Sequence, residues 1–475
     1  RYRLDWVGKK EAILTANAPI AKTLRPCREE SVNFDSTENL FIEGDNLEAL
    51  KLLQENYLGK VKMIYIDPPY NTGKDFVYED DFAESTNSFF EKSSQVDEEG
   101  NRLVANTESN GRFHSDWLSM MYSRLKLARN LLKDDGVVFI SIDDNEQDNL
   151  NKICNEILGE QNFIAMLPTI MNLKGNNDQF GFAGTHEYLL VYAKNLDELS
   201  ELNGLPLDID DIKNYNLKDS KGLYKLGATL MRTGEAGARK FRPKGYYPIY
   251  VSQDLTRMSL ERLSEDDFEV FPKTTSGQEM SWRRSPETLS NSIDEFIIKK
   301  TLNGISFYKK QRLDEDNRIG KKPKSLFYKP EYSSSNGTGL LKNIFGDRFF
   351  DNPKPLALLM DLIRIGSTES SIILDFFAGS ATTAHAVMQL NAEDAGKRKF
   401  IMVQLPEQTD EKSEAHKAGY KNITEISKER IRRAGKKILE DNATKEGIEK
   451  LDIGFRVLKI DSTNMKDVYY TPDAY

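Results

Sequence analysis

Residues 39–70 read NLFIEGDNLEALKLLQENYLGKVKMIYIDPPY, and this stretch indicates one β-turn-α-β unit. A short apolar strand leads to a turn at Gly44 and Asp45, after which leucines recur at helical spacing. A second apolar strand over residues 61–66 ends at Asp67. In open α/β sheets ligands bind beyond the carboxyl ends of the strands, so the position of Asp67 favours a functional role.

The same alternation occurs on both sides of a long interruption. Further strands are predicted over residues 137–142, 162–168 and 187–194. A strand, a small-residue loop and a helix are predicted over residues 371–390, followed by a strand over 399–407. We therefore expect an α/β fold with a mainly parallel sheet and an antiparallel end, whose two halves flank an insertion.

The sequence divides into five segments. We expect an N-terminal arm at 1–30, the first half of the sheet at 31–199, the insertion at 200–344, the second half at 345–450 and the start of a C-terminal extension at 451–475. Residues 79–112 are polar and poor in apolar residues, which predicts a long loop near the site.

Composition limits the class of protein. The chain has 475 residues, of which 39% are apolar, a net charge of −9, two cysteines and four histidines. Such a chain can form a globular protein of more than one domain. Two cysteines cannot form a disulfide framework, and the histidines show no metal-binding spacing, so no metal site is expected. No signal peptide or membrane span is readable, which favours a cytoplasmic protein.

The insertion reverses the acidic balance of the chain. Residues 221–250 hold seven Lys or Arg against one acidic residue, and residues 299–329 hold ten against three. Aromatic residues are interleaved with both runs, as is typical of surfaces that contact phosphates and bases together. A solvated surface without a ligand is the alternative, with about equal weight when the charge runs are considered alone.

The DPPY tetrad at residues 67–70 offers a specific pattern of acceptors. The Asp67 carboxylate and the Pro68 carbonyl, in a segment stiffened by Pro68 and Pro69, suit the two hydrogens of an NH2 group. The ring of Tyr70 suits stacking on an aromatic ring that carries this amine. The tetrad therefore predicts contact with a nucleobase amine, adenine N6 or cytosine N4, on a base taken out of its duplex. An isolated tetrad is more often a simple turn, but its place after a buried strand favours chemistry.

A second loop, DFFAGSATT at residues 375–383, joins a predicted strand to a helix. Its small residues let backbone N–H groups approach a ligand, and the helix start near Thr382 favours an anionic group. A nucleotide or a nucleoside amino acid would fit, and a tight turn without a ligand is the alternative. A further acidic group, Asp143, Asp144 and Glu146, stands where a helix begins, and we interpret it as helix capping.

These motifs and their order resemble a known family. DPPYNTG followed by DFFAGSATTAH is similar to the amino-group DNA methyltransferases of permuted order, in which the catalytic tetrad precedes the target-recognition region and the S-adenosylmethionine loop follows it. GDNLEALK, GVVFISIDDNE, THEYLLVYAKN, FDNPKP and LDIGFRVLKIDS extend the likeness over nearly the whole chain. Together they resemble the modification subunits of type III restriction-modification systems.

The resemblance implies a permuted, Rossmann-like methyltransferase sheet with the insertion as target-recognition domain. It implies methyl transfer from S-adenosyl-L-methionine to adenine N6 in double-stranded DNA with base flipping, by Asp67, Pro68, Pro69 and Tyr70. Glu407 is an alternative to Gln404 for contact with the ribose. The implied cofactor site comprises Asp45, Asn46, Asn352, Lys354, Asp375, Phe377, Ala378, Gly379, Ser380, Thr382 and Gln404.

The resemblance also implies partners. These are double-stranded DNA, a second copy of the chain in a homodimer, and a restriction subunit that is an ATP-dependent translocating nuclease. The DNA recognition sequence is not predicted, since base readout depends on side chains whose place in a groove the sequence does not give. Candidate DNA-binding residues in the insertion are Lys240, Arg242, Lys244, Trp282, Arg283 and Arg284.

Four other readings compete with this one. The first is a standalone methyltransferase without a nuclease partner, acting on adenine N6 or cytosine N4. The second is a methyltransferase for a planar amide such as glutamine, which would not need the basic insertion. The third is a DNA-recognition module without chemistry, whose tetrad would be damaged, whereas this one is intact. The fourth, cytosine C5 methylation, would need a cysteine after proline, and only Cys27 in the expected arm follows one.

Overall fold

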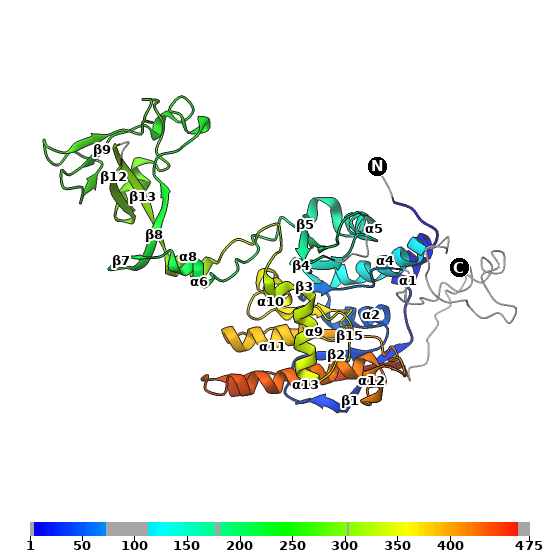
Figure 1. Ribbon diagram of the computed structural model, residues 1–475. Coiled ribbons are helices and arrows are strands. Elements are labelled where there is room, and N and C mark those ends of the chain that lie inside the picture. The colour runs from blue at the N-terminus through cyan, green and yellow to red at the C-terminus, as the bar shows by residue number, and fades with distance from the viewer. Residues whose placement is uncertain (1–3, 73–112, 176–180, 302–303, 464–475) are drawn as a thin grey trace, which may run out of the picture. The chain divides into compact units, whose positions relative to one another are not determined.

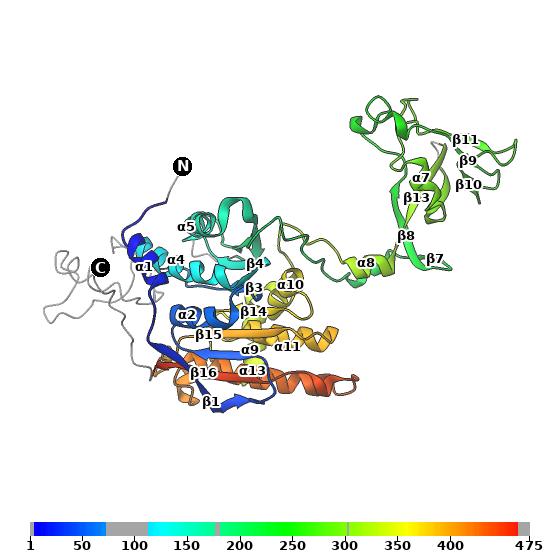
Figure 2. The same ribbon diagram turned by 180° about the vertical axis from the view of Figure 1, so that it is seen from behind.

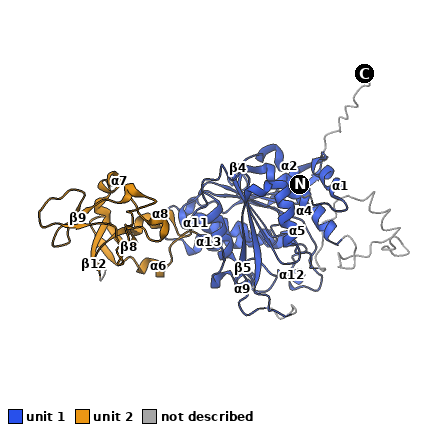
Figure 3. Ribbon diagram, turned by 90° about the horizontal axis from the view of Figure 1, so that it is seen from above, with its two compact units in different colours: residues 1–203, 323–475 blue, residues 204–322 orange. Residues whose placement is uncertain are grey.

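The computed structural model describes residues 4–72, 113–175, 181–301 and 304–463. The chain divides into two compact units, unit 1 with residues 1–203 and 323–475 and unit 2 with residues 204–322 (Figure 3). Unit 2 lies within the insertion expected at 200–344, whereas residues 323–344 belong to unit 1. The loop expected at 79–112 lies outside the described residues.

Unit 1 is built on a nine-stranded sheet. Its six middle strands, from β16 to β4, are parallel, while β1 at one edge and β6 near the other run antiparallel to their neighbours. The mainly parallel sheet with an antiparallel end is therefore confirmed. In order across the sheet the strands are β1 (Lys22–Val32), β16 (Phe455–Ser462), β2 (Leu40–Glu43), β15 (Lys399–Gln404), β14 (Ile372–Asp375), β3 (Val61–Ile66), β4 (Leu132–Ile142), β6 (His186–Ala193) and β5 (Phe163–Ile170).

The middle strands are continuous apolar runs because both faces of the sheet are covered. Nearly every residue of β3 and β15 is buried. Figure 3 shows α2 and α4 on one side of the sheet and α11 and α13 on the other. The α-helices in the described residues of unit 1 are α1 (Lys9–Asn17), α2 (Asn46–Tyr57), α4 (Phe113–Leu131), α5 (Gln147–Cys154), α9 (Ser334–Phe345), α10 (Leu356–Gly366), α11 (Thr382–Asp394), α12 (Glu414–Lys417) and α13 (Ile423–Asp441).

Both ends of the chain differ from the sequence prediction. The expected arm at 1–30 contains α1 and most of β1, and the expected extension from 451 contains β16. These two strands pair with each other, and Figure 2 shows β1 beside β16. β16 also pairs with β2, which is labelled in Figure 1. β1 is an edge strand with few buried residues and a proline, so its sequence lacks the apolar run that identifies a strand.

Unit 2 has two small antiparallel sheets. Its core is formed by buried side chains that include Ile249, Trp282 and Phe307. One sheet contains β12 (Phe296–Thr301), β13 (Gly304–Arg312), β8 (Gly222–Thr229) and β7 (Leu217–Asp219), and the other β10 (Met258–Ser259), β9 (Ile249–Val251) and β11 (Phe268–Val270). Its α-helices are α6 (Ile209–Lys213), α7 (Pro286–Ser290) and α8 (Leu313–Ile319).

No helix among the described residues is long and apolar enough to span a membrane. Within the same residues, no group of three or more His, Cys, Asp or Glu side chains is arranged to hold a metal ion.

Candidate active site

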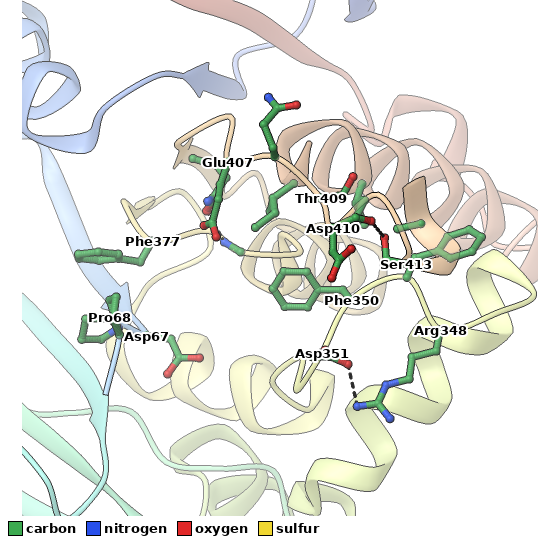
Figure 4. A pocket seen from close by; sticks show the side chains of 18 residues that line it. Asp67, Pro68, Arg348, Phe350, Asp351, Phe377, Glu407, Thr409, Asp410 and Ser413 are labelled. Atoms are coloured by element: carbon green, nitrogen blue, oxygen red, sulfur yellow. Dashed lines mark hydrogen bonds and ion pairs between the residues drawn. The ribbon is translucent and has the colours of Figure 1, made fainter. Parts of the chain in front are cut away.

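The two motifs lie at the same edge of the sheet. β3 and β14 are adjacent parallel strands, so Asp67, directly after β3, and Phe377, just after β14, both follow carboxyl ends. A cavity of about 720 Å³ opens there, and Figure 4 shows Asp67, Phe377 and Glu407 around it. It is lined by Asp67, Pro68, Pro69, Arg348, Phe349, Phe350, Asp351, Phe377, Gly379, Gln404, Glu407, Gln408, Thr409, Asp410, Ser413, Ala415, Ile423 and Ile426.

A polar network surrounds Asp67. The Tyr70 hydroxyl lies 2.9 Å from Asp67 Oδ1 and 3.0 Å from Glu187 Oε2. The Lys354 ammonium donates to the Tyr70 hydroxyl and to Glu187 Oε2, each at 2.6 Å, and lies 3.2 Å from Asp67 Oδ1. Lys354, expected at the cofactor, therefore contacts the DPPY tetrad.

Burial and charge oppose each other at Asp67. Burial raises the pKa of the Asp67 carboxyl above its usual range, the Lys354 ammonium opposes this rise, and the Glu187 carboxylate adds to it. Burial disfavours the charge on Lys354, but the carboxylates of Asp67 and Glu187 outweigh it and hold the pKa of Lys354 above its usual range. The Lys354 ammonium thus favours an ionised Asp67, which can accept hydrogen bonds.

A buried tryptophan forms a hydrogen bond to the backbone of the tetrad. Trp117 on α4 donates its indole N–H to the carbonyl of Pro69 at 2.7 Å and is fully buried. No described residue donates to the Pro68 carbonyl, which lies in the segment that lines the cavity. The structure therefore leaves the acceptor that the sequence singled out available to a ligand.

The loop after β14 is shaped by its own side chains. Asp375 is buried, and it accepts from the backbone N–H of Phe377 and from the hydroxyl of Thr383. Burial raises the pKa of Asp375 to about 7. Gly379 has a φ of +51°, a left-handed conformation, and its N–H donates to Gln404 Oε1 at 2.7 Å. Asp375 thus supports the loop, while Gly379 and Gln404 line the cavity.

Helix α13 holds the same loop from behind. The Ser427 hydroxyl donates to the carbonyl of Gly379, and Arg430 donates to the hydroxyl oxygens of Ser380 and Thr382 at 2.7 and 2.6 Å. Arg430 is fully buried. Ser380 and Thr382, expected at the cofactor, therefore face α13 and do not line the cavity.

Other expected cofactor residues also lie outside the cavity lining. Asp45 caps α2 by accepting from the N–H groups of residues 47 and 48, and Asn46 donates to the carbonyl of Phe376 at 2.9 Å. Both contact the buried guanidinium of Arg124. They fix the start of α2 beside the loop. Ala378 and Asn352 are likewise absent from the lining.

The acidic group after β4 differs in part from the capping interpretation. Asp143 accepts from the N–H of Asn145. Glu146 stands at the N-cap of α5 but forms no capping hydrogen bond, so capping by its side chain is wrong. It is fully buried, and its Oε1 accepts instead from Asn71 Nδ2 at 2.5 Å. The same oxygen lies 2.6 Å from His114 Nδ1. Glu146 thus ties the residue after the tetrad to α4.

The six residues expected to bind DNA differ in their burial and contacts within unit 2. Trp282 is 5% exposed, packs on Phe307 and donates its indole N–H to the Tyr247 carbonyl, so it belongs to the core and cannot stack on DNA. Arg242 and Lys244 are exposed and form no ion pair with a described residue. Of the remaining three, Lys240 pairs with Glu235, Arg283 is exposed with Nε bonded to the Thr229 carbonyl, and Arg284 lies near the Phe296 ring.

Sequence reasoning missed Glu187 and Phe350. Glu187 lies 117 residues from Tyr70 in the chain and looked like part of a strand. Phe350 lines the cavity and approaches Gly379, but it is the first residue of the FDNPKP motif, from which only later residues were chosen. The sequence did contain a signal for Glu187. This residue is the glutamate of the THEYLLVYAKN motif, and it stands at the start of an apolar strand.

Comparisons with known proteins agree with this geometry. A family model described as DNA methylase matches residues 61–434, which is well over half of the chain. The chain belongs to this DNA methylase family. It is an S-adenosyl-L-methionine-dependent DNA methyltransferase with an α/β methyltransferase fold, as the sequence predicted.

The DNA methylase is similar to several curated proteins. It is 43% identical to the type III restriction-modification enzyme EcoPI Mod subunit of Escherichia phage P1, covering 100% of this chain and 76% of that protein. It is 36% identical to the EcoP15I Mod subunit of Escherichia coli, over 92% of this chain and 69% of that protein. The type II methyltransferase M.KpnI of Klebsiella pneumoniae is 33% identical, over 84% of this chain and 88% of that protein. The resemblance to type III modification subunits is therefore confirmed.

Proposed function

We propose that the chain methylates adenine N6 at specific sites in double-stranded DNA, as the modification and recognition subunit of a type III restriction-modification system. The observation that carries the proposal is the single cavity lined by Asp67 and by the loop at Phe377 and Gly379. A donor of a methyl group and an acceptor base must share one space for direct transfer. The similarity to the EcoPI and EcoP15I Mod subunits supports the type III assignment.

The residues of the cavity suit S-adenosyl-L-methionine. Phe377 and Phe350 offer apolar surface, and the amide of Gln404 and the carboxyl of Glu407 offer polar groups for the ribose hydroxyls. The bound cofactor supplies a methyl group on a positively charged sulfur. Burial raises the pKa of Glu407, and either this residue or Gln404 can contact the ribose.

The tetrad residues then bind and activate the amine. The lone pair of adenine N6 is delocalised into its ring, so the nitrogen is a weak nucleophile. Asp67 and the Pro68 carbonyl accept its two N–H groups, which favours a tetrahedral nitrogen and stabilises the positive charge that develops there. The ring of Tyr70 packs beside the base. The base must leave the duplex to reach these groups.

Unit 2 is proposed as the target-recognition domain. Arg242 and Lys244 are exposed cations that form no ion pair with an acidic residue in the described part of the chain, so they are the preferred candidates for contact with phosphates. Arg283 is a third exposed cation. Much of the remaining positive charge of this unit is neutralised within it, as Asp219 illustrates by pairing with both Lys310 and Arg312. Local charge therefore counts more than the sum over the insertion.

The partners of the chain form a further part of the proposal. Type III systems combine a modification subunit with a restriction subunit, so we propose such a nuclease partner, a homodimer of this chain and a cytoplasmic location. A standalone methyltransferase is the second candidate, favoured by the 33% identity to the type II methyltransferase M.KpnI. Assembly with a coexpressed restriction subunit, measured by size exclusion, separates the two candidates.

One experiment tests the base, the sequence context and the activity together. The protein is incubated with S-adenosyl-L-methionine and plasmid DNA, and the DNA is sequenced by a method that detects N6-methyladenine and N4-methylcytosine. We expect N6-methyladenine at one recurrent sequence. N4-methylcytosine would contradict the adenine assignment, and unmodified DNA would contradict the proposed function.

A further inference from the structure

Glu187 lies at the active edge of the sheet for a topological reason. β6 runs antiparallel to β4, with Tyr188 paired to Ile142 at the carboxyl end of β4. The start of β6 therefore lies at the edge where the parallel strands end, and Glu187 is its second residue. This edge also carries Asp67 after β3. An antiparallel strand thus brings a carboxylate to a site that parallel strands define.

The two oxygens of Asp67 have different surroundings. Oδ1 lies 2.9 Å from the Tyr70 hydroxyl and 3.2 Å from the Lys354 ammonium. No hydrogen bond or ion pair joins Oδ2 to a described residue. The Asp67 side chain is 28% exposed and lines the cavity. One oxygen is thus bound by the protein, and the other is available to a ligand.

Glu187 fixes the two groups that contact Oδ1. Its Oε2 lies 2.6 Å from the Lys354 ammonium and 3.0 Å from the Tyr70 hydroxyl. Both contacts are closer than the contact between Lys354 and Asp67, so Glu187 is the nearer carboxylate for the ammonium. The Lys354 ammonium therefore has two carboxylate partners, Glu187 and Asp67. Without Glu187, Asp67 would be its one carboxylate partner among these residues.

We propose that Glu187 is a positioning residue for methyl transfer, which holds Lys354 and Tyr70 at Oδ1 of Asp67 and so keeps Oδ2 for the substrate amine. This role rests on the proposed function. Without Glu187, the full charge of Lys354 is drawn to the Asp67 carboxylate. A neutral amine donates weaker hydrogen bonds than an ammonium, so it would compete poorly for that carboxylate.

The test compares two matched substitutions in the full chain. Glu187→Gln removes the charge while keeping the size of the side chain, and Glu198→Gln makes the same change at an exposed residue just after β6. The readouts are the single-turnover methylation rate at saturating cofactor and DNA, and the affinity for each. We expect E187Q to lower the rate at least about tenfold with both affinities within about twofold of wild type, and E198Q to match wild type.

A double-mutant cycle distinguishes positioning from general structural support. In a Lys354→Met background, E187Q should lower the rate by no more than about twofold, because Glu187 then has no ammonium to hold. A wild-type rate in E187Q, or the same tenfold loss in both backgrounds, would overturn the role.

Two further outcomes are decisive. If E187Q does not fold, as judged by its melting temperature, Glu187→Asp carries the test alone, because its shorter side chain keeps the charge but withdraws the oxygens from Lys354 and Tyr70, and a wild-type rate in that variant overturns the role. A wild-type protein that transfers no methyl group contradicts the proposed function itself, which is a different failure from a wild-type rate in E187Q.

Discussion

At Asp67 a single carboxylate has to be both partly buried and charged. Burial favours its protonated form, and the Lys354 ammonium at 3.2 Å favours its ionised form. Glu187 limits how much of the lysine charge Asp67 receives. The acceptor strength of Asp67 therefore depends on residues that are distant in the chain, and it can be changed without altering the tetrad.

The first prediction concerns the acceptor itself. Asp67→Asn replaces one carboxylate oxygen by an NH2 group, which repels the N–H groups of the substrate amine. We expect the methylation rate to fall at least about 100-fold, since the acceptor acts mainly in the transition state. DNA affinity, measured by fluorescence anisotropy, should stay within about threefold of wild type. An equal loss of binding and methylation would mean that Asp67 supports the structure and not the chemistry.

The second prediction concerns Asp375 and pH. Burial raises its pKa to about 7 from an ordinary value of 3.8, so the folded state binds a proton more tightly than the unfolded state. Its destabilising contribution therefore appears as the pH rises from about 4 to about 7 and is complete above that, on the order of a few kcal/mol.

Asp375→Asn removes this titration while keeping the oxygen that accepts from Phe377. We expect the variant to melt at a higher temperature than wild type at pH 8 and at nearly the same temperature at pH 4, in paired thermal melts. A constant difference between the two proteins at both pH values would contradict the raised pKa.

The residues that the sequence identified are those whose role is local. The DPPY tetrad and the loop at 375–383 each follow a strand with a clear apolar run, so their meeting at one edge could be predicted. The sequence could place Asp45, Asn46 and Ser380 near the cofactor loop. It could not decide whether they bind a ligand, because a short polar side chain can equally well form hydrogen bonds within the protein, as in a helix cap. Trp282 was misassigned because its neighbouring arginines suggested DNA, whereas its burial depends on packing within unit 2.

At the level of elements, α13 matters as much as the strands. Its Ser427 and Arg430 hold the carbonyl and hydroxyl groups of residues 379–382, so the N–H of Gly379 can point to Gln404. Sequence periodicity can identify such a helix, but not the loop that it supports. The strands β1 and β16 were likewise missed, since each has too many exposed or half-buried residues to form a continuous apolar run.

The third prediction tests the loop after β14. Gly379→Asp places a side chain at a left-handed φ of +51°, with its Cβ 3.3 Å from Phe350, and adds a negative charge in the cavity. We expect at least about tenfold weaker binding of S-adenosyl-L-methionine by calorimetry. Gly447→Asp is the matched control, because Gly447 has a φ of +83° and open space around it. Unchanged affinity in G379D would refute the placement of the cofactor.

For the whole molecule, the distribution of charge decides how a chain of net charge −9 can bind DNA. In unit 2 several cations are neutralised by nearby acids, as Lys221 is by Asp294 and Glu295. Arg242 and Lys244 are not. Counting basic residues in the sequence indicated the right region but overestimated the number of cations available to phosphates.

The fourth prediction follows from these two residues. Replacing Arg242 and Lys244 by alanine should weaken DNA binding and reduce the slope of log affinity against log salt by about two, one for each lost phosphate contact. The control variant, Lys436→Ala with Lys437→Ala, removes the same charge from exposed positions of α13. Equal slopes for both variants and wild type would show that the two residues do not contact DNA.

The order of strands also bears on how the enzyme is made. β2 and β3 are joined by α2 alone, yet in the sheet β15 and β14 stand between them. A ribosome therefore releases Asp67 well before residues 372–404, its partners in the cavity. All of unit 2 is translated in that interval. A nascent chain therefore cannot complete the cavity around Asp67 before unit 2, the proposed target-recognition domain, has been synthesised.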